Sequence, residues 1–507
     1  MGDPAVYFPV EVRDSIFDYA TNRGRDARSL ASCCRVNRNW NSTARPLLYT
    51  RWTYHGEKHS IRSLWKFLCT ATRDDSIAAL VQAVDVRNWS FPSETLHPDF
   101  EIPQEELLLV RQAFRAAGME GMDRSVMNDV KHGDRKPFMA LLFTRLPNLR
   151  TMSAHLPHYD AFLGSVLKGA LANQTETPTM HAFQELEELS LVSEWERPYR
   201  ESFHNTRYSL ELVCYARVFS LPRLRRLSLF DLDIEDALHH CGPRPRTSFI
   251  QHLTLVNNQY TKATAPETQA ILAMPIALNS LTFYQNDCGL GPPQPDEAIA
   301  ISNAQLFTSL EGHMKSLEYL DIYRDGTGTT PQQHSEEISH FGLLQGFERL
   351  KILRVHPETL LGGNRDDPRA PFRLKDTLPT SLESLTFYGT SGLILDLELE
   401  SQFREVLQGG SFPNLKCVTF EDVSEFVHYY IPSYVKRPNQ AVKALCYEAR
   451  VNFRERKIRH FPKGGKQQPW FMNAMRIRRL RERKVEITTE DEYNPKDDVS
   501  DTSVVNS

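Results

Sequence analysis

The sequence of 507 residues lacks any apolar run long enough to cross a bilayer, which takes roughly 18–20 residues. Its first fifteen residues hold no uninterrupted apolar stretch of the kind found in a secretion signal. The formal net charge of −4 argues neither for nor against a polyanionic partner. We therefore expect a soluble protein of the cytoplasm, the nucleus or both, with no membrane partner.

Cysteines at metal-binding spacing are also missing. Apart from the adjacent pair Cys33 and Cys34, the eight cysteines lie tens of residues apart, with no C-x-x-C motif and no zinc-finger pairing with histidine. The motifs of metalloproteases, serine hydrolases, dinucleotide-binding proteins and kinases are absent as well. The sequence thus predicts no metal, no cofactor and no catalytic centre, and the cysteines are interpreted as small hydrophobic packing groups.

The first fifty residues have the pattern of short amphipathic helices. Pro9 suits a first helical turn, and apolar residues recur at helical steps after it. A second helix is predicted over 27–44, ended by Pro46. The apolar residues proposed to form one binding face are Phe8, Pro9, Val12, Ile16, Leu30, Cys33, Val36 and Trp40.

This segment resembles an F-box in the form common in fungal F-box proteins. The likeness rests on FPVEVRDSIFDYA followed by LASCCRVNRNWNSTARPLLY, and it covers about residues 6–50. The resemblance implies docking on the adaptor subunit of a cullin–RING ubiquitin ligase. A module of this size is too small to bury its own apolar stripe, so a partner surface is physically reasonable. The alternative is that the helices only cap the domain that follows.

A second pattern, L-x-x-L-x-L with substitutions, recurs along the middle of the chain. Each copy predicts one short parallel strand whose leucines enter a shared core, and stacked copies would form an irregular leucine-rich-repeat solenoid. A conventional α/β domain with a parallel sheet is the main alternative. The nine copies lie at 149–154, 186–191, 224–229, 250–255, 278–283, 317–322, 350–355, 382–387 and 415–420, with a possible tenth at 81–86.

The positions between and after the last two leucine-type residues of each copy should line the concave face of such a solenoid. The first of these is mostly Ser or Thr, and the second is mostly aromatic or His. Rigid rings are typical of recognition surfaces, although they could equally pack against loops at the strand ends. The residues predicted to bind a target protein are Tyr284, Asp321, Tyr323, Arg354, His356 and Tyr388.

The C-terminal part changes composition. Val442, Leu445, Ala449 and Phe453 keep helical steps, and residues 450–484 contain 13 Lys or Arg against 2 Asp or Glu. The basic segment is interpreted as a solvated helix, with nuclear import as one alternative and nucleic-acid binding as a less favoured one. The acidic end of the chain is predicted to be disordered.

Together these observations predict an α/β protein in four parts. They are an F-box-like module at 1–52, a leucine-rich-repeat-like solenoid at 53–430, a basic helical segment at 431–485 and an acidic tail at 486–507. The resemblance implies a non-catalytic substrate receptor that binds the ligase adaptor, and through it the cullin complex, together with a target protein. A stand-alone repeat scaffold without a ubiquitin-ligase role is the alternative.

Overall fold

The computed structural model describes residues 11–12, 15–17, 27–56, 59–87, 101–119, 121–157, 160–172, 182–193, 210–230, 232–233, 244–257, 265–286, 301–325, 340–362, 371–388, 398–422 and 439–457. All of them belong to one compact unit that ends at Ile458. The basic cluster at 476–484 and the acidic tail lie outside the described residues.

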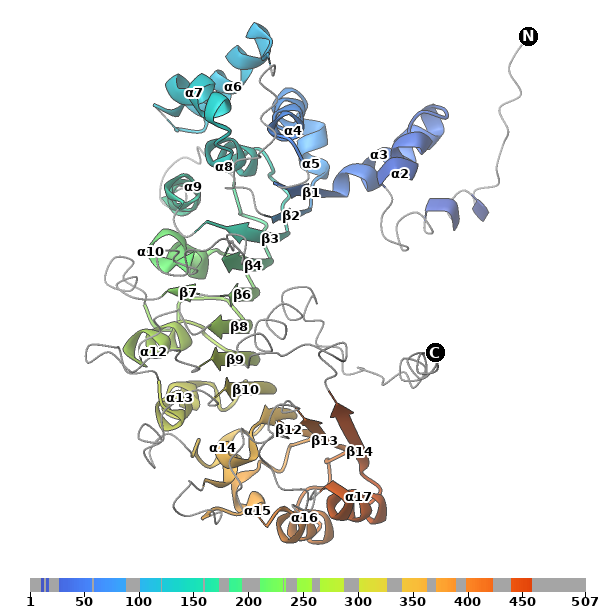
Figure 1. Ribbon diagram of the computed structural model, residues 1–507, viewed down its shortest axis with the longest axis vertical. Helices are drawn as coiled ribbons and strands as arrows, with labels where there is room; N and C mark the ends of the chain where they lie inside the picture. The colour runs from blue at the N-terminus through green and yellow to red at the C-terminus, as the bar shows by residue number, and fades with distance from the viewer. Residues whose placement is uncertain are drawn as a thin grey trace, which may run out of the picture. The chain divides into compact units, whose positions relative to one another are not determined.

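A twelve-stranded, entirely parallel sheet organises this unit. Its strand order follows the order of the chain throughout, as Figure 1 shows. The strands are β1 (Arg51–His55), β2 (Ala83–Arg87), β3 (Thr151–Leu156), β4 (Glu188–Ser193), β6 (Arg226–Phe230), β8 (His252–Asn257), β9 (Ser280–Asn286), β10 (Tyr319–Asp325), β11 (Ile352–Val355), β12 (Ser384–Tyr388), β13 (Cys417–Asp422) and β14 (Asn452–Lys457).

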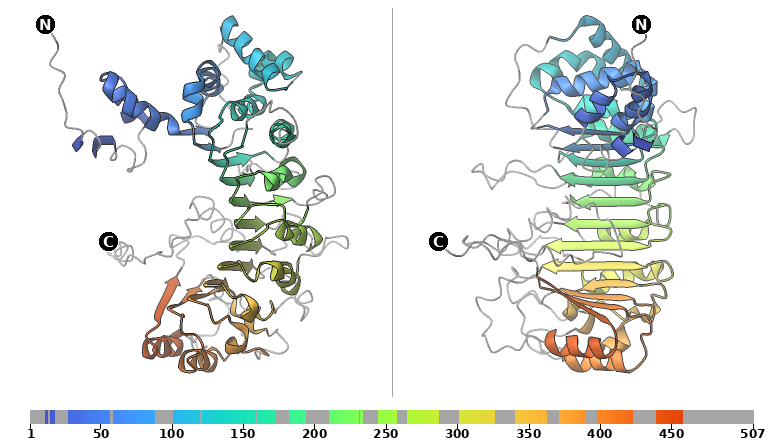
Figure 2. Two further views of the ribbon diagram at one scale, coloured as in Figure 1. Left: turned by 180° about the vertical axis from the view of Figure 1, so that it is seen from behind. Right: turned by 90° about the vertical axis from the view of Figure 1, so that its right-hand side faces the viewer.

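Helices connect successive strands and lie along one face of the sheet, which the two views of Figure 2 make clear. The longer ones are α4 (Ile61–Arg73), α5 (Asp75–Leu80), α6 (Gln104–Ala116), α7 (Met122–His132), α8 (Lys136–Thr144), α9 (Ala161–Ala172), α12 (Ala265–Ala273), α13 (Asn303–Leu310), α16 (Leu399–Gln408) and α17 (Asn439–Glu448). The shorter ones are α10 (Leu212–Tyr215), α14 (Pro357–Leu361), α15 (Leu374–Thr377) and the 3-10 turns at Ala216–Ser220, Glu311–His313 and Leu344–Gly346. A separate two-stranded sheet pairs β5 (Leu210–Glu211) with β7 (Leu232–Asp233).

The repeated leucine pattern explains this topology. All ten copies, including 81–86, contain a strand of the parallel sheet. The strand residues alternate, so that in β10 Leu320 and Ile322 enter the core while Tyr319, Asp321 and Tyr323 lie on the opposite face. One strand cannot bury its leucines alone, so each connection folds back over them and a single hydrophobic core runs from Tyr54 to Cys446.

The sheet is longer at its C-terminal end than the leucine pattern predicts. The helix expected to run through Phe453 ends at Glu448 instead, and Phe453 lies in β14, paired with Val418 of β13. The ring of Phe453 packs against Phe420 at 5.7 Å between centroids. Four of the six residues in NFRERK are charged, and charged side chains are common on edge strands. Pairing of this segment with β13 outweighs the helical spacing.

The single N-terminal helix predicted over 27–44 is instead two helices, α2 (Ala27–Cys33) and α3 (Arg38–Thr50). A turn at Cys34–Val36 separates them, and the Asn37 side chain accepts a hydrogen bond from the backbone N–H of Trp40 at 2.9 Å, which caps α3. The prediction that Pro46 ends the helix is also wrong. Pro46 lies within α3, which continues to Thr50 and leads directly into β1.

Candidate interaction sites

The N-terminal helices have a small hydrophobic cluster of their own, distinct from the main core. Phe17, Leu30 and Ala44 are buried in it, and Trp40 packs on Phe17 edge to face with 5.6 Å between ring centroids. Cys33, Cys34 and Leu48 pack against the same cluster. Both cysteines are free and half-buried, and burial is the main cause of the raised pKa of the Cys34 thiol. Cys33 and Cys34 therefore act here as packing groups.

This cluster does not use all of the apolar residues predicted for the N-terminal face. Leu30 is buried, Ile16, Cys33 and Trp40 are half-buried, and Val12 and Val36 are 43% and 57% exposed. Val36 leaves the apolar stripe because the turn before Asn37 changes the helical phase. Phe8 and Pro9 lie outside the described residues.

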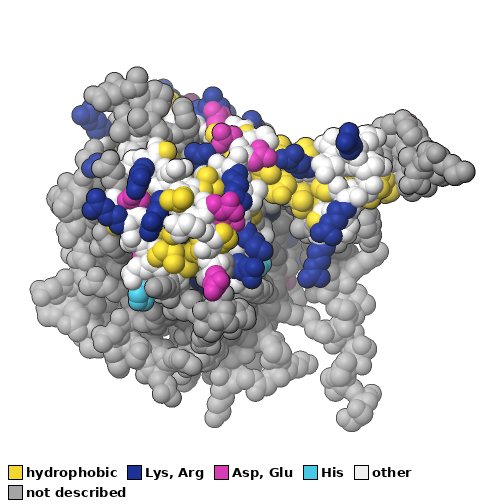
Figure 3. Space-filling model, turned by 90° about the horizontal axis from the view of Figure 1, so that it is seen from above, with side chains coloured by type: hydrophobic (Ala, Val, Ile, Leu, Met, Phe, Trp, Pro, Cys, Tyr) yellow, Lys and Arg dark blue, Asp and Glu magenta, His cyan; other side chains and the backbone are white. Residues whose placement is uncertain are grey.

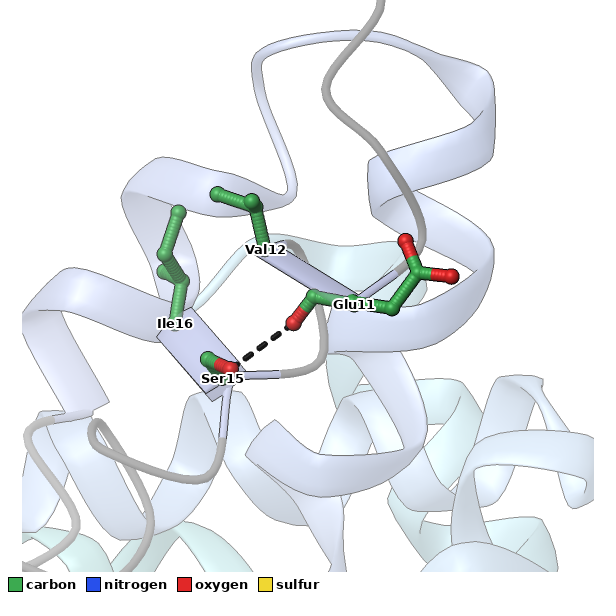
Figure 4. A pocket seen from close by; sticks show the side chains of 4 residues that line it. All are labelled: Glu11, Val12, Ser15 and Ile16. Carbon is green, nitrogen blue, oxygen red and sulfur yellow. Dashed lines mark hydrogen bonds between the residues drawn. The ribbon is translucent and has the colours of Figure 1, made fainter.

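A shallow hollow beside Val12 shows how this surface is built. Glu11, Val12, Ser15 and Ile16 line it, and Figure 4 shows the Val12 and Ile16 side chains next to each other. The Ser15 hydroxyl donates to the Glu11 carbonyl oxygen at 2.8 Å and so satisfies its own hydrogen-bonding needs within the helix. The remaining exposed atoms there are largely hydrocarbon, which suits contact with an apolar partner.

The second candidate lies on the face of the sheet opposite the leucine core, called the polar face here. The six residues predicted to bind a target come together on it. Asp321 of β10 lies at the centre and accepts hydrogen bonds from Tyr284 of β9 at 2.9 Å, from Tyr388 of β12, and from Tyr319 at 3.1 Å. Three phenols thus satisfy one carboxylate.

Arg354 joins this group from β11. Its Nη2 donates to Glu421 of β13 at 2.8 Å, and its Nε lies 3.8 Å from Asp321. Its guanidinium carbon is 5.7 Å from the ring centroid of Tyr388. Burial alone lowers the pKa of Arg354, but the surrounding phenols and Asp321 outweigh it and raise the pKa above its ordinary value. The guanidinium is therefore fixed as a cation between two carboxylates.

The rings complete the cluster. Tyr323 packs on Tyr284 at 5.5 Å, on His356 at 4.9 Å and perpendicular to Tyr388 at 5.2 Å between centroids. Burial followed by the charge of Asp321 raises the pKa of Tyr319 well above its usual value, so this phenol remains a donor. These contacts lock the six residues, with Tyr319 and Glu421, into one rigid arrangement.

Burial sets this cluster apart from the exposed recognition surface that the sequence predicts. Tyr284, Asp321, Tyr323, His356 and Tyr388 are each at most 7% exposed, whereas the Arg354 side chain is 23% exposed. The rings of Tyr284, Tyr323, His356 and Tyr388 contact one another across the strands. Sequence reasoning did not select Tyr319 and Glu421. Glu421 lies in register with Tyr388, and Tyr319 lies two residues before Asp321 on the same face of β10.

The polar face is more open over the N-terminal strands. Ser153, Ser190 and Ser228 form a row across β3, β4 and β6 and are partly exposed. At β1 and β2, Asp85 lies between two arginines, with Oδ2 3.2 Å from Arg51 Nη2 and Oδ1 3.1 Å from Arg87 Nε. This end of the sheet offers hydroxyl and charged groups that a partner can reach.

Other groups that could carry chemistry are metal-binding clusters and thiols. No cluster of three or more His, Cys, Asp or Glu in the described ranges could hold a metal ion. Burial raises the pKa of Cys69 to about 12 and that of Cys446 to about 11, so both remain protonated thiols at neutral pH. Within the same ranges, no helix combines the length and apolarity that crossing a membrane requires.

We compared the chain with known proteins. No protein-family model matches the chain, and no curated protein matches it.

Proposed function

We propose that this protein is the substrate-recognition subunit of a cullin–RING ubiquitin ligase. Its N-terminal helices would act as an F-box that docks on the ligase adaptor, and its stacked strands would form a leucine-rich-repeat solenoid that holds a target protein. No cofactor is needed for this role. Such a subunit works by raising the effective concentration of the target near a ubiquitin-conjugating enzyme, not by making or breaking bonds itself.

The main observation behind the proposal is that apolar side chains of the N-terminal helices remain exposed. Of the described residues, Phe17, Leu30 and Ala44 are buried in their cluster, whereas Val12, Val36 and Leu47 are at least 36% exposed. Figure 3 shows hydrophobic side chains on this helical segment, at the right of the view. Exposed apolar residues on a small helical unit are typical of a docking surface, and the F-box resemblance of residues 6–50 indicates the kind of partner.

The alternative is a repeat scaffold without a ligase role. The attachment of α3 to the sheet domain supports this alternative, because Arg45 forms an ion pair with Asp74 at 2.9 Å and α3 continues into β1. Helices attached in this way could serve only to cap the first strand. The two functions differ in whether Val12 and Val36 contact a ligase adaptor.

Co-purification of the full-length chain with the ligase adaptor tests the proposal. Val12→Asp and Val36→Asp are the informative variants because both side chains are exposed and contribute nothing to the buried cluster. We expect stoichiometric binding by the wild type and at least a tenfold loss of affinity in the double variant, since a charge would be desolvated in an apolar interface.

Leu108→Asp is the matched control. Leu108 lies on α6 and is 48% exposed, so the same change is made on a similarly exposed residue away from the N-terminal helices. Adaptor binding by this variant should equal that of the wild type. Absence of adaptor binding by folded wild-type protein would leave the scaffold as the function.

A further inference from the structure

A second hollow lies beside the N-terminal helices, on residues that the docking proposal does not use. It is a cavity of about 550 Å³ between the turn after α2, one face of α3 and the helix α5. Its lining residues are Cys34, Arg35, Asn37, Arg38, Asn41, Ser42, Arg45, Pro46, Ser76 and Leu80.

All charged residues that line this cavity are positive. Three arginines line the cavity and no Asp or Glu does. Arg45 forms an ion pair with Asp74 at 2.9 Å. Arg35 and Arg38 are exposed and form no ion pair with any residue in the described ranges. Among the residues that the structure describes, no carboxylate therefore pairs with the positive charges of Arg35 and Arg38.

The geometry of α3 spaces these charges along the cavity. Arg38 and Arg45 are two turns apart, which places their backbones about 10 Å apart on one side of the helix. Arg35 precedes them in the turn, where its N–H bonds to the Ser32 carbonyl oxygen at 3.0 Å. The first turn of α3 contains no acidic residue, so the positive end of the helix dipole adds to the same field.

The other lining groups are short and polar. The Asn37 side-chain oxygen caps α3, which leaves its NH2 group as a donor, and Asn41 donates to the Cys34 carbonyl oxygen at 3.0 Å. Ser76 is fixed by its hydrogen bond to Asp74. Only Leu80 and Pro46 offer sizeable apolar contact, which is too little for the side chains of a docked peptide.

We infer that this cavity binds a small molecule bearing two or more phosphate groups. Guanidinium groups are planar, permanently charged and matched to phosphate oxygens in a bidentate arrangement. Their spread along α3 favours an extended polyanion over a single phosphate. The inference does not depend on adaptor docking, although the lining residues Arg35 and Asn37 flank Val36 in the chain.

Titration calorimetry with sodium tripolyphosphate on the full-length protein, in buffer of low ionic strength, tests the inference. We expect one molecule to bind per chain, at least tenfold more tightly than inorganic phosphate. The double variant Arg35→Gln, Arg38→Gln should weaken tripolyphosphate binding at least tenfold. Both side chains are exposed, so circular dichroism should show an unchanged fold.

Arg124→Gln is the control, since Arg124 is an exposed arginine on α7. It should change tripolyphosphate affinity less than twofold. Equal weakening by the control, binding of several molecules per chain, or no binding at all would overturn the inference. A hexaglutamate peptide that binds as tightly as tripolyphosphate would overturn the assignment to phosphate and indicate an acidic protein segment.

Discussion

At the scale of residues, the polar face of the sheet is stabilised by the hydrogen bonds of a few buried side chains. Asp321 accepts three phenol hydrogen bonds and faces Arg354, and its side chain is almost fully buried. A buried carboxylate is costly unless its oxygens are satisfied, so these donors are what allows it to sit there. Asp160 is another buried carboxylate, at 1% exposed, and hydrogen bonds offset the loss of its hydration only in part.

Replacing Asp321 with Asn should lower the free energy of unfolding by about 3 kcal/mol, because Arg354 loses a nearby negative charge and three phenols lose a charged acceptor. The denaturant midpoint measures this. Glu383→Gln is the control: its ion pair with Lys416 is partly exposed, with side-chain exposures of 35% and 70%, and should contribute at most about 1 kcal/mol. Equal effects of the two changes would contradict the role assigned to the buried network.

Asp160 predicts a pH effect. Its Oδ1 accepts the backbone N–H groups of Phe162 and Leu163 at 2.9 and 3.1 Å, yet burial raises its pKa to about 6. The unfolded chain loses this proton near pH 4, so the contribution of Asp160 to stability falls as the pH rises from about 4 to about 6.

Asp160→Asn keeps the hydrogen-bond acceptor and removes the charge. The variant should lose this part of the pH dependence and gain up to about 2–3 kcal/mol of unfolding free energy at pH 7. Chemical unfolding at a series of pH values measures both. A variant less stable than the wild type at pH 7 would show that the carboxylate is stabilised by something other than its two N–H donors.

At the scale of elements, the division between α2 and α3 is set by capping. Asn37 has extended backbone angles and caps the second helix, and this stops the apolar stripe of residues 27–44 from forming one continuous helix. The break exposes Val36 and shapes the cavity lined by Arg35 and Arg38.

Asn37→Ala should therefore destabilise α3 by about 1 kcal/mol, whereas Asn37→Asp should retain the cap. Because these helices have their own hydrophobic cluster, the effect should be local. Hydrogen exchange of the amides in the first turns of α3 measures it, with exchange in β9 and β10 as the internal reference. Loss of protection throughout the sheet would mean that α3 does not open independently.

For the whole molecule, each strand of the sheet pairs only with its neighbours along the chain. Stability in such a stack is close to a sum of units and the interfaces between them. A central residue therefore supports two interfaces, and a residue on the last strand supports one.

Leu320→Ala in β10 should cost about 2–5 kcal/mol and reduce hydrogen-exchange protection in strands on both sides of it. Phe453→Ala in β14 should cost less, because Phe453 is only partly buried, and should affect mainly β13, β14 and α17. Hydrogen exchange resolved by segment distinguishes these patterns. A uniform loss of protection from both changes would show that the sheet unfolds as one cooperative block.

The sequence by itself determined the class of fold. Each copy keeps the L-x-x-L-x-L spacing, and the leucines of one short strand are buried when successive strands share one core. It also indicated which residues meet on the polar face, since strands in register bring equivalent positions side by side. The burial of Tyr284, Tyr323 and Tyr388 was decided only in the tertiary structure, because rings from different strands cover one another. The same holds for the twelfth strand and for the cavity beside α3. Whether a strand adds to a sheet edge, and what a helix face contacts, depend on the elements packed beside them. The spacing of apolar residues within one segment does not specify those neighbours.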